Sequence, residues 1–370
     1  MRCAPTKMSS TPTWGLRTSQ RHAKRMTATR KPPLHQRLRH AWPVMVLATL
    51  IVAGLAAPLV FHAATAGFFL EVLLGGLMAG VLYSLVALGF VLIYKASGVF
   101  NFAQGAMVLF AALATARLAE HMPLVLATVV SFALMVALAW IVERLVLRPL
   151  VNQSAVALLL ATLGISFFLE GFGQAVWGND IYKIDLGLPK EPMILAAQLF
   201  EGGILVSRDD LVAASVVAAL VLVLGLFFQK TATGRALRAV ADDHLAAQSI
   251  GIPLNHIWVI VWSVAGFVAL VAGLVWGSKL GVQFSLSQIA LKALPVAILG
   301  GLTSIPGAIL GGLIIGVGEK FAEVFLGQAL SHWFSLSGGG IENWFAYVLV
   351  LAFLLVRPEG LFGERHIDRV

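Results

Sequence analysis

The sequence GRALRAVADDHLAAQSIGI, residues Gly234–Ile252, is a polar, helix-prone segment between two long apolar stretches. On a helical wheel its apolar residues share one face, formed by Leu237, Val240, Ala241 and Leu245. Another face carries Arg235, Arg238 and Asp242, and Gly251 and Pro253 then stop the helix. This pattern predicts an amphipathic helix that packs on a membrane bundle and offers its charges to a soluble partner. The alternative is a solvated connector.

The remainder of the chain has the composition of a membrane protein. Hydrophobic residues make up 59% of the sequence, charged residues 12%, and the mean hydropathy is +0.89. Because about 20 apolar residues cross a bilayer as a helix, we predict an all-α, polytopic integral membrane protein with about ten helices that span or half-span the membrane. The predicted helices are Trp42–Ala64, Phe68–Tyr94, Phe102–Ala119, Pro123–Val142, Ala155–Val176, Leu211–Phe228, His256–Trp276, Ile289–Leu302, Pro306–Phe325 and Trp344–Val356.

Positive charge is concentrated at the N-terminus. Residues 1–40 hold ten Lys or Arg and no acid, so the rest of the chain carries 16 basic and 18 acidic residues. This distribution argues against a nucleic-acid partner and follows the positive-inside rule. We predict a disordered, basic, cytoplasmic tail over 1–40 and a membrane domain over 41–370. Ten crossings would place both termini and the loop 229–254 in the cytoplasm.

The first predicted helix has an alternative interpretation. The stretch Val44–Ala66 ends in FHAATA, residues 61–66, which could mimic a signal-peptide cleavage site. The apolar run before it is longer than the usual 7–15 or so residues, so we expect the helix to be retained. The sole cysteine, Cys3, permits no intrachain disulfide and no cysteine-based metal cluster.

The helix order suggests two similar halves, 42–176 and 211–356, each a lone helix followed by four more. If the first helix runs outward, the two four-helix blocks are inverted, which would place a pathway at their interface near the midplane. Gly300, Gly301 and Pro306 lie in a glycine-rich region where a broken helix could line that path. Tight helix packing is the alternative explanation for these glycines.

Two neutral amide side chains lie at the start of the third predicted helix. Asn101 and Gln104 could hydrogen-bond a polar solute without the cost of burying a charge. The alternative for Asn101 is that it caps the helix. Four ionisable residues lie inside apolar spans, and we interpret them as structural or interfacial; they are Glu170, Glu319, Lys320 and Glu323.

Motifs for enzymatic chemistry are missing from the sequence. It contains no Gly-Lys dipeptide, so it holds no G-x-x-x-x-G-K-[ST] phosphate loop, and it has neither H-E-x-x-H nor G-x-S-x-G. We therefore expect no enzymatic activity, no metal and no cofactor on this chain. If ATP powers it, another polypeptide binds the nucleotide.

Five stretches, in the same order along the chain, resemble permeases of ATP-binding cassette (ABC) importers of the branched-chain amino acid family, the LivH-like group. One is the opening segment, which resembles the loop on which the ATPase seats. The other four are GLMAGVLYSLVALGFVLIYKASGVFNFAQG at Gly76–Gly105, LLLATLGISFFLEG at Leu158–Gly171, LPVAILGGLTSIPGAILGG at Leu294–Gly312 and RPEGLFG at Arg357–Gly363.

The resemblance implies a set of partners and a function. It implies ABC ATPase subunits, a second permease subunit that is identical or related, a periplasmic solute-binding protein and a bacterial inner membrane. The implied coupling residues are Gly234, Arg235, Arg238, Ala239, Asp242, Asp243, Ala246 and Gly251. The implied solute is a branched-chain amino acid or a related small polar molecule, and relatives that import urea or short amides leave the substrate open. A carrier driven by an ion gradient and a scaffold without transport are the alternatives from other classes.

Overall fold

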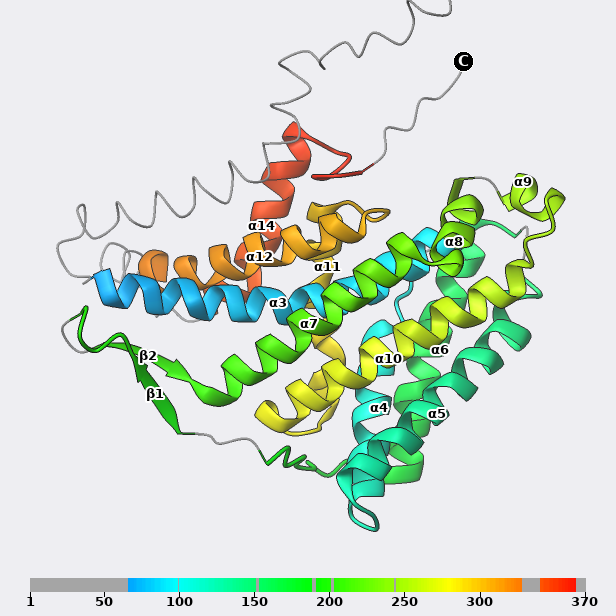
Figure 1. Ribbon diagram of the computed structural model, residues 1–370. Coiled ribbons are helices and arrows are strands. Elements are labelled where there is room, and N and C mark those ends of the chain that lie inside the picture. The colour runs from blue at the N-terminus through cyan, green and yellow to red at the C-terminus, as the bar shows by residue number, and fades with distance from the viewer. Residues whose placement is uncertain are drawn as a thin grey trace, which may run out of the picture. The chain divides into compact units, whose positions relative to one another are not determined.

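The computed structural model describes residues 66–98, 100–150, 153–187, 191–200, 203–242, 244–327 and 340–363 (Figure 1). The predicted basic tail and the predicted helix Trp42–Ala64 lie outside these residues. Helices form nearly all of the regular structure that is described, so the all-α fold class is confirmed.

The helices follow the predicted segments closely. Their bounds are α3 Ala66–Ser97, α4 Gln104–Ala119, α5 Leu124–Val142, α6 Ala155–Trp177, α7 Arg208–Lys230, α8 Ala232–Asp242, α9 His244–Ser249, α10 Leu254–Leu280, α11 Ile289–Gly300, α12 Ile305–Phe321 and α14 Ile341–Val356. Shorter helical segments are the π-helices η1 Glu143–Leu147 and η3 Ala322–Leu326 and the 3₁₀-helix η2 Phe284–Gln288. Strands β1 Pro192–Leu195 and β2 Ile204–Ser207 pair antiparallel, with Pro192 opposite Ser207.

The predicted number of spans is not confirmed. By length and composition, five described helices could cross a membrane: α3, α5 with η1, α6, α7 and α10. A sixth candidate is the pair of η2–α11 and α12–η3, which is bent by 117° at the break between them. The helix α4 and the apolar part of α14, Trp344–Val356, are shorter. Since the inverted repeat depended on ten spans, it remains a prediction.

The central contact of the bundle is between α3 and α12, which lie side by side (Figure 1). Glycines make this contact close: a Cβ added at Gly80 would lie 2.6 Å from the Gly312 carbonyl oxygen, and one at Gly316 would lie 2.4 Å from the Gly80 Cα. Small residues allow membrane helices to approach in this way. The Ser84 hydroxyl donates to the Gly80 and Ile309 carbonyl oxygens, at 2.7 and 3.1 Å, and thereby links the two helices.

A second packed group surrounds α10, which contacts α3, α4 and α5. The backbone of α10 approaches α4 at Gly273, where an added Cβ would lie 2.7 Å from the Val108 carbonyl oxygen. The helix α4 is buried on all sides from Gln104 to Ala116. In contrast, α5 and α6 contact the bundle along one side only, and their other sides are exposed.

Polar contacts fasten the end of the bundle that carries the β-hairpin. The Glu71 carboxylate accepts a hydrogen bond from the Leu205 N–H at 3.3 Å. Lys279 of α10 forms an ion pair with Asp210 of α7. The helix α8 lies at the other end of α7 (Figure 1). One end of α7 therefore adjoins the β-hairpin, and the other end adjoins α8.

Candidate functional site

The corner between α7 and α8 is held by backbone and side-chain contacts. The Thr231 hydroxyl accepts a hydrogen bond from the Gly234 N–H at 3.2 Å, in the first turn of α8. A Cβ at Gly234 would lie 1.8 Å from the Phe228 carbonyl oxygen, so the corner excludes any larger residue there. This explains why glycine is needed at Gly234.

Two arginines bind the last carbonyl groups of α7. Arg238 donates to the Phe228 and Gln229 oxygens, at 2.7 and 3.3 Å, and Arg235 donates to the Lys230 oxygen at 3.2 Å. The final carbonyls of a helix lack partners within the helix and favour cations. Arg238 is therefore half-buried as part of the corner, whereas Arg235 is exposed.

The faces of α8 agree with the helical wheel. Leu237 and Val240 are buried, and α8 packs on α3 and α10. Its hydrophilic side includes the exposed Arg235 and the half-buried Ala239.

The helix that Gly251 and Pro253 were predicted to stop is described as two helices, α8 and α9. Asp242 is the last residue of α8, and a separate helix, α9, carries the exposed Ala246. Asp243, between the two, lies outside the described residues. Gly251 adopts φ +86°, the left-handed conformation that ends this segment before α10. The segment therefore ends at the glycine that the sequence predicted to stop it.

The break between α11 and α12 holds the glycines predicted to line a path. α11 ends at Gly300, Gly301 has φ +99°, and Pro306 lies in the first turn of α12. A Cβ at Gly300 would lie 2.3 Å from the Gly307 carbonyl oxygen. The glycines therefore bring the two helices together, as the packing alternative predicts.

The RPEGLFG segment closes this break. The Leu361 N–H donates to the Leu299 oxygen at 2.7 Å, and the Phe362 N–H donates to the Gly300 oxygen at 3.1 Å. A Cβ at Gly301 would also lie 2.6 Å from the Gly363 nitrogen. The end of α11 thus receives from a distant segment the hydrogen bonds that a helix end lacks.

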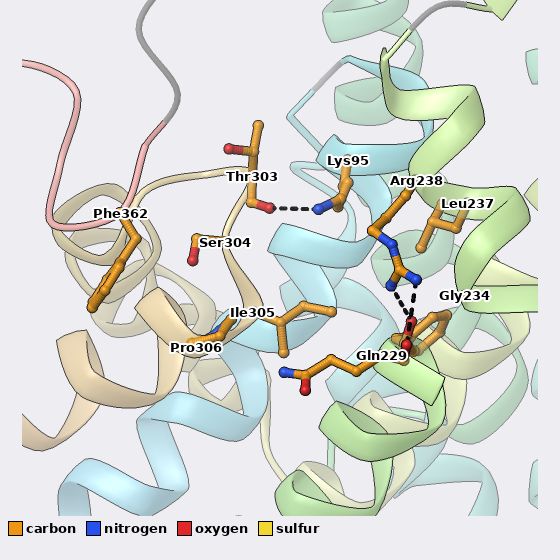
Figure 2. A pocket seen from close by; sticks show the side chains of 11 residues that line it. Lys95, Gln229, Gly234, Leu237, Arg238, Thr303, Ser304, Ile305, Pro306 and Phe362 are labelled. Carbon is orange, nitrogen blue, oxygen red and sulfur yellow. Dashed lines mark hydrogen bonds between the residues drawn. The ribbon is translucent and has the colours of Figure 1, made fainter. Parts of the chain in front are cut away.

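A small cavity of about 180 Å³ joins the α7–α8 corner to the α11–α12 break. Figure 2 shows Lys95 and Arg238 between the two: the Lys95 ammonium donates to the Thr303 oxygen at 3.1 Å, and Arg238 reaches the end of α7. The lining residues are Lys95, Phe228, Gln229, Gly234, Leu237, Arg238, Thr303, Ser304, Ile305, Pro306 and Phe362. Residues predicted separately for coupling and for the path therefore share one site.

Sequence reasoning missed Lys95 and Thr303 as members of this site. Lys95 was interpretable only as a charge at the end of a span, and Thr303 only as part of a turn. The SIPG turn that follows Thr303 was a usable signal, because a turn between two short helices must expose backbone carbonyls.

Asn101 and Gln104 lie elsewhere, fully buried among α3, α4 and α10. The Asn101 amide donates to the Gln104 side-chain oxygen at 3.5 Å and accepts from the Ala103 N–H at 3.0 Å. Gln104 donates to the Ala265 oxygen at 3.4 Å and abuts Gly89. In this conformation both amides form hydrogen bonds within the protein. The N-cap of α4 is Ala103, without a side-chain cap, and Asn101 accepts from its N–H one residue before the helix.

The ionisable residues near the end of α12 have partners. Lys320 pairs with Glu323 at 2.7 Å, and the buried Glu319 is hydrogen-bonded to Tyr83 of α3. Lys292 pairs with Glu342 at 3.3 Å and connects α11 to α14. These contacts agree with a structural role for Glu319, Lys320 and Glu323.

Comparison with known proteins gives a consistent match. Residues 72–357 match the family described as the permease component of the branched-chain amino acid transport system. The high-affinity branched-chain amino acid transport permease LivH of Salmonella typhimurium is 28% identical, over 82% of this chain and 98% of its own length. The corresponding BraD of Pseudomonas aeruginosa is 29% identical over the same shares. A probable LivH of Methanocaldococcus jannaschii is 30% identical, over 79% of this chain and 92% of its own.

Proposed function

The chain belongs to the family of branched-chain amino acid transport permeases, and from this we propose that it is the membrane-spanning permease subunit of an ATP-driven importer. The proposed solute is a branched-chain amino acid or a related small polar molecule. The match over 72–357 carries this proposal, because it includes both the α7–α8 corner and the α11–α12 break. The family consists of components of multi-subunit transport systems, so membership does not favour a carrier that works alone on an ion gradient.

We propose that a separate ATPase subunit binds the nucleotide and seats on α8 and α9. Two contacts support this assignment. The buried Leu237 and Val240 hold α8 on the bundle, and Arg238 fixes it to the end of α7. Because α8 and α7 are joined in this way, a displacement of α8 would be transmitted along α7.

The cavity offers a second route for the same motion. Lys95 of α3 bonds to the Thr303 oxygen, beside Arg238, so α8, α3 and the α11–α12 break meet there. Closure of an ATPase dimer would press on α8 and shift the break. In this proposal Gly300, Gly301 and Pro306 act as a hinge that gates the path.

The remaining partners follow from the same assignment. A periplasmic binding protein would deliver solute at the end of the bundle that carries the β-hairpin. A second permease subunit would enclose the path, in a bacterial inner membrane with both termini in the cytoplasm.

The test of this function is uptake of radiolabelled leucine by cells that express the chain with its partner proteins. We expect uptake that requires ATP, and co-purification of P-loop ATPases with the tagged chain. Transport by the purified chain alone in liposomes, driven by an ion gradient, would overturn the proposal. Competition by unlabelled urea, acetamide or valine would assign the substrate class.

The coupling site requires a separate variant. Arg238→Glu would break two hydrogen bonds of the α7–α8 corner, so its effect would report on local structure. Arg235→Glu is the less disruptive probe, because Arg235 is exposed and its substitution removes one such bond, to the Lys230 oxygen, instead of two. We expect Arg235→Glu to insert normally and to reduce solute-stimulated ATP hydrolysis several-fold. Unaltered stimulation in this variant would refute the contact.

A further inference from the structure

A second cavity, of about 210 Å³, lies between α3, α4, α6 and the η2–α11 segment. Phenylalanine rings form much of its wall, and they come from three places in the chain: Phe90 of α3, Phe100 and Phe102 before α4, and Phe167 of α6. The first three form a cluster, with ring centroids 4.6 Å apart for Phe90 and Phe100 and 4.8 Å apart for Phe100 and Phe102. This wall is suited to an aliphatic group.

Glu170 of α6 is the one charged residue among those that line this cavity in the described chain. It lies 15 residues after the start of α6 and seven before its end, or roughly 10 Å from the nearer end of a helix that is long enough to cross a membrane. Within the described residues, its carboxylate forms no hydrogen bond or ion pair. An ionised group at such a depth is costly without a partner and commonly marks a site of function.

The other polar groups of the cavity are neutral. They come from Ser166, Ser287 and Gln288. The Ser287 hydroxyl donates to the Phe284 oxygen at 2.9 Å, whereas the Ser166 hydroxyl and the Gln288 amide can donate hydrogen bonds to a carboxylate. The rim is open, since Phe167 is 72% exposed and Leu291 is 52% exposed. The volume is below the roughly 300–1,000 Å³ of pockets for drug-sized ligands, so the cavity fits a small solute.

We propose that this cavity holds the solute in transit, and that the Glu170 carboxylate pairs with the ammonium group of a small aliphatic amino acid. The phenylalanine wall contacts the aliphatic side chain, while Ser166 and Gln288 donate to the carboxylate of the solute. An uncharged amide could donate a hydrogen bond to Glu170 but could not balance its charge. This inference rests on the proposed importer function and assigns the site at which the importer binds the ammonium group of its solute.

The test uses the complete importer, purified with its ATPase, binding protein and second permease subunit and reconstituted in liposomes with ATP. The probe is radiolabelled L-leucine. Glu170→Gln keeps the size of the side chain and removes its charge. Because a hydrogen bond to a charged group contributes about 1.5–3 kcal/mol, we expect the maximal uptake rate to fall about tenfold or more. Glu170→Asp, which restores the charge, should recover part of the rate.

A matched pair of variants separates the cavity from the surface of α6. Phe167 and Phe168 are adjacent and similarly exposed, at 72% and 64%, but Phe168 does not line the cavity. Phe167→Ala should lower leucine uptake several-fold, and Phe168→Ala should leave it within twofold of the unmodified protein. Equal effects of the two variants would contradict the assignment of the wall.

Two further readouts make failure informative. Recovery of the assembled complex should match that of the unmodified importer for Glu170→Gln, and its loss would assign Glu170 a structural role instead. Basal ATP hydrolysis should be unchanged in Phe168→Ala, the matched control outside the cavity. Normal leucine uptake by Glu170→Gln would overturn the site while leaving the importer function intact. No leucine uptake by the unmodified importer would instead overturn the proposed function, and the amino-acid site with it.

Discussion

Helices α3 and α6 are both apolar and long enough to cross a membrane, yet they differ in burial. In the most apolar 18-residue window of each helix, 78% of α3 is buried inside the structure and 22% of α6 is. Apolarity therefore selects the segments that enter a bilayer without deciding which of them forms the core. Lipid tails are as apolar as leucine, so burial must be decided by other features.

Close backbone approach is the feature that distinguishes the two helices. Gly76 and Gly80 of α3 meet Gly312 and Gly316 of α12. Gly164 and Gly171 of α6 have open space where a Cβ would stand. The α3–α12 contact thus depends on glycines that face each other from both helices.

The largest expected effect comes from filling the glycine contact. Gly316→Leu would place a Cβ 2.4 Å from the Gly80 backbone, with three further carbons beyond it. Overpacking costs about 1–3 kcal/mol even where neighbours relax, and backbone atoms yield less, so we expect no recovery of folded, monodisperse protein. Gly164→Leu is the control and should retain the yield and melting temperature of the unmodified chain. Recovery of Gly316→Leu at normal yield would show that the α3–α12 contact is dispensable.

A smaller difference is expected from removing leucine side chains. Leu85 of α3 is 1% exposed and Leu160 of α6 is 60% exposed. Lipid tails are as apolar as leucine, so moving a leucine side chain from the bilayer into the protein changes the free energy little. Leu85→Ala should therefore lower the free energy of unfolding only through the cavity that it leaves, by about 1–2 kcal/mol. Leu160→Ala should cost less than about 0.5 kcal/mol, with both measured by denaturant unfolding in detergent. An equal cost for Leu160→Ala in the assembled importer, but not in the isolated chain, would show that a partner covers α6.

The smallest expected effect concerns one hydroxyl group. Ser84→Ala removes the donor to the Ile309 oxygen, and a hydrogen bond between membrane helices contributes about 0.6 kcal/mol on average. Ser166→Ala on α6 should leave stability unchanged, because no hydrogen bond of its hydroxyl is found in the described chain. The same unfolding measurement compares them. If Ser166→Ala lowered the free energy of unfolding more than Ser84→Ala, the hydroxyl on α6 would contribute more to stability than the one on α3.

The sequence predicted the helices well, because apolar runs bounded by polar residues define them. The predicted segments Pro123–Val142 and His256–Trp276 correspond to α5 and α10 within a few residues. The end of α8 at Asp242 was not predicted, since no glycine or proline stands there to signal it. Whether a helix crosses the membrane depends on its tilt and neighbours, which a hydrophobic pattern does not contain.

The candidate sites were predicted only in part. Periodicity identified the buried face of α8, but no local pattern could show that Arg238 and Thr303 line one cavity, because about 65 residues separate them. Glu170 had an available signal, since it is a lone acid one turn after Phe167 in an apolar helix. The sequence could not show that Glu170 lines a cavity, because the phenylalanine rings beside it come from α3 and from the segment before α4 and are brought near only by folding.

The docking of RPEGLFG on α11 has a consequence for biosynthesis. The ribosome delivers Leu361 and Phe362 some sixty residues after Leu299 and Gly300, whose oxygens they bind. The break between α11 and α12 is therefore completed only after α12 and α14 have been synthesised. A nascent chain truncated between α12 and Leu361 leaves these two carbonyls without the donors that the complete break has, so the end of α11 stays unsatisfied until the RPEGLFG segment arrives.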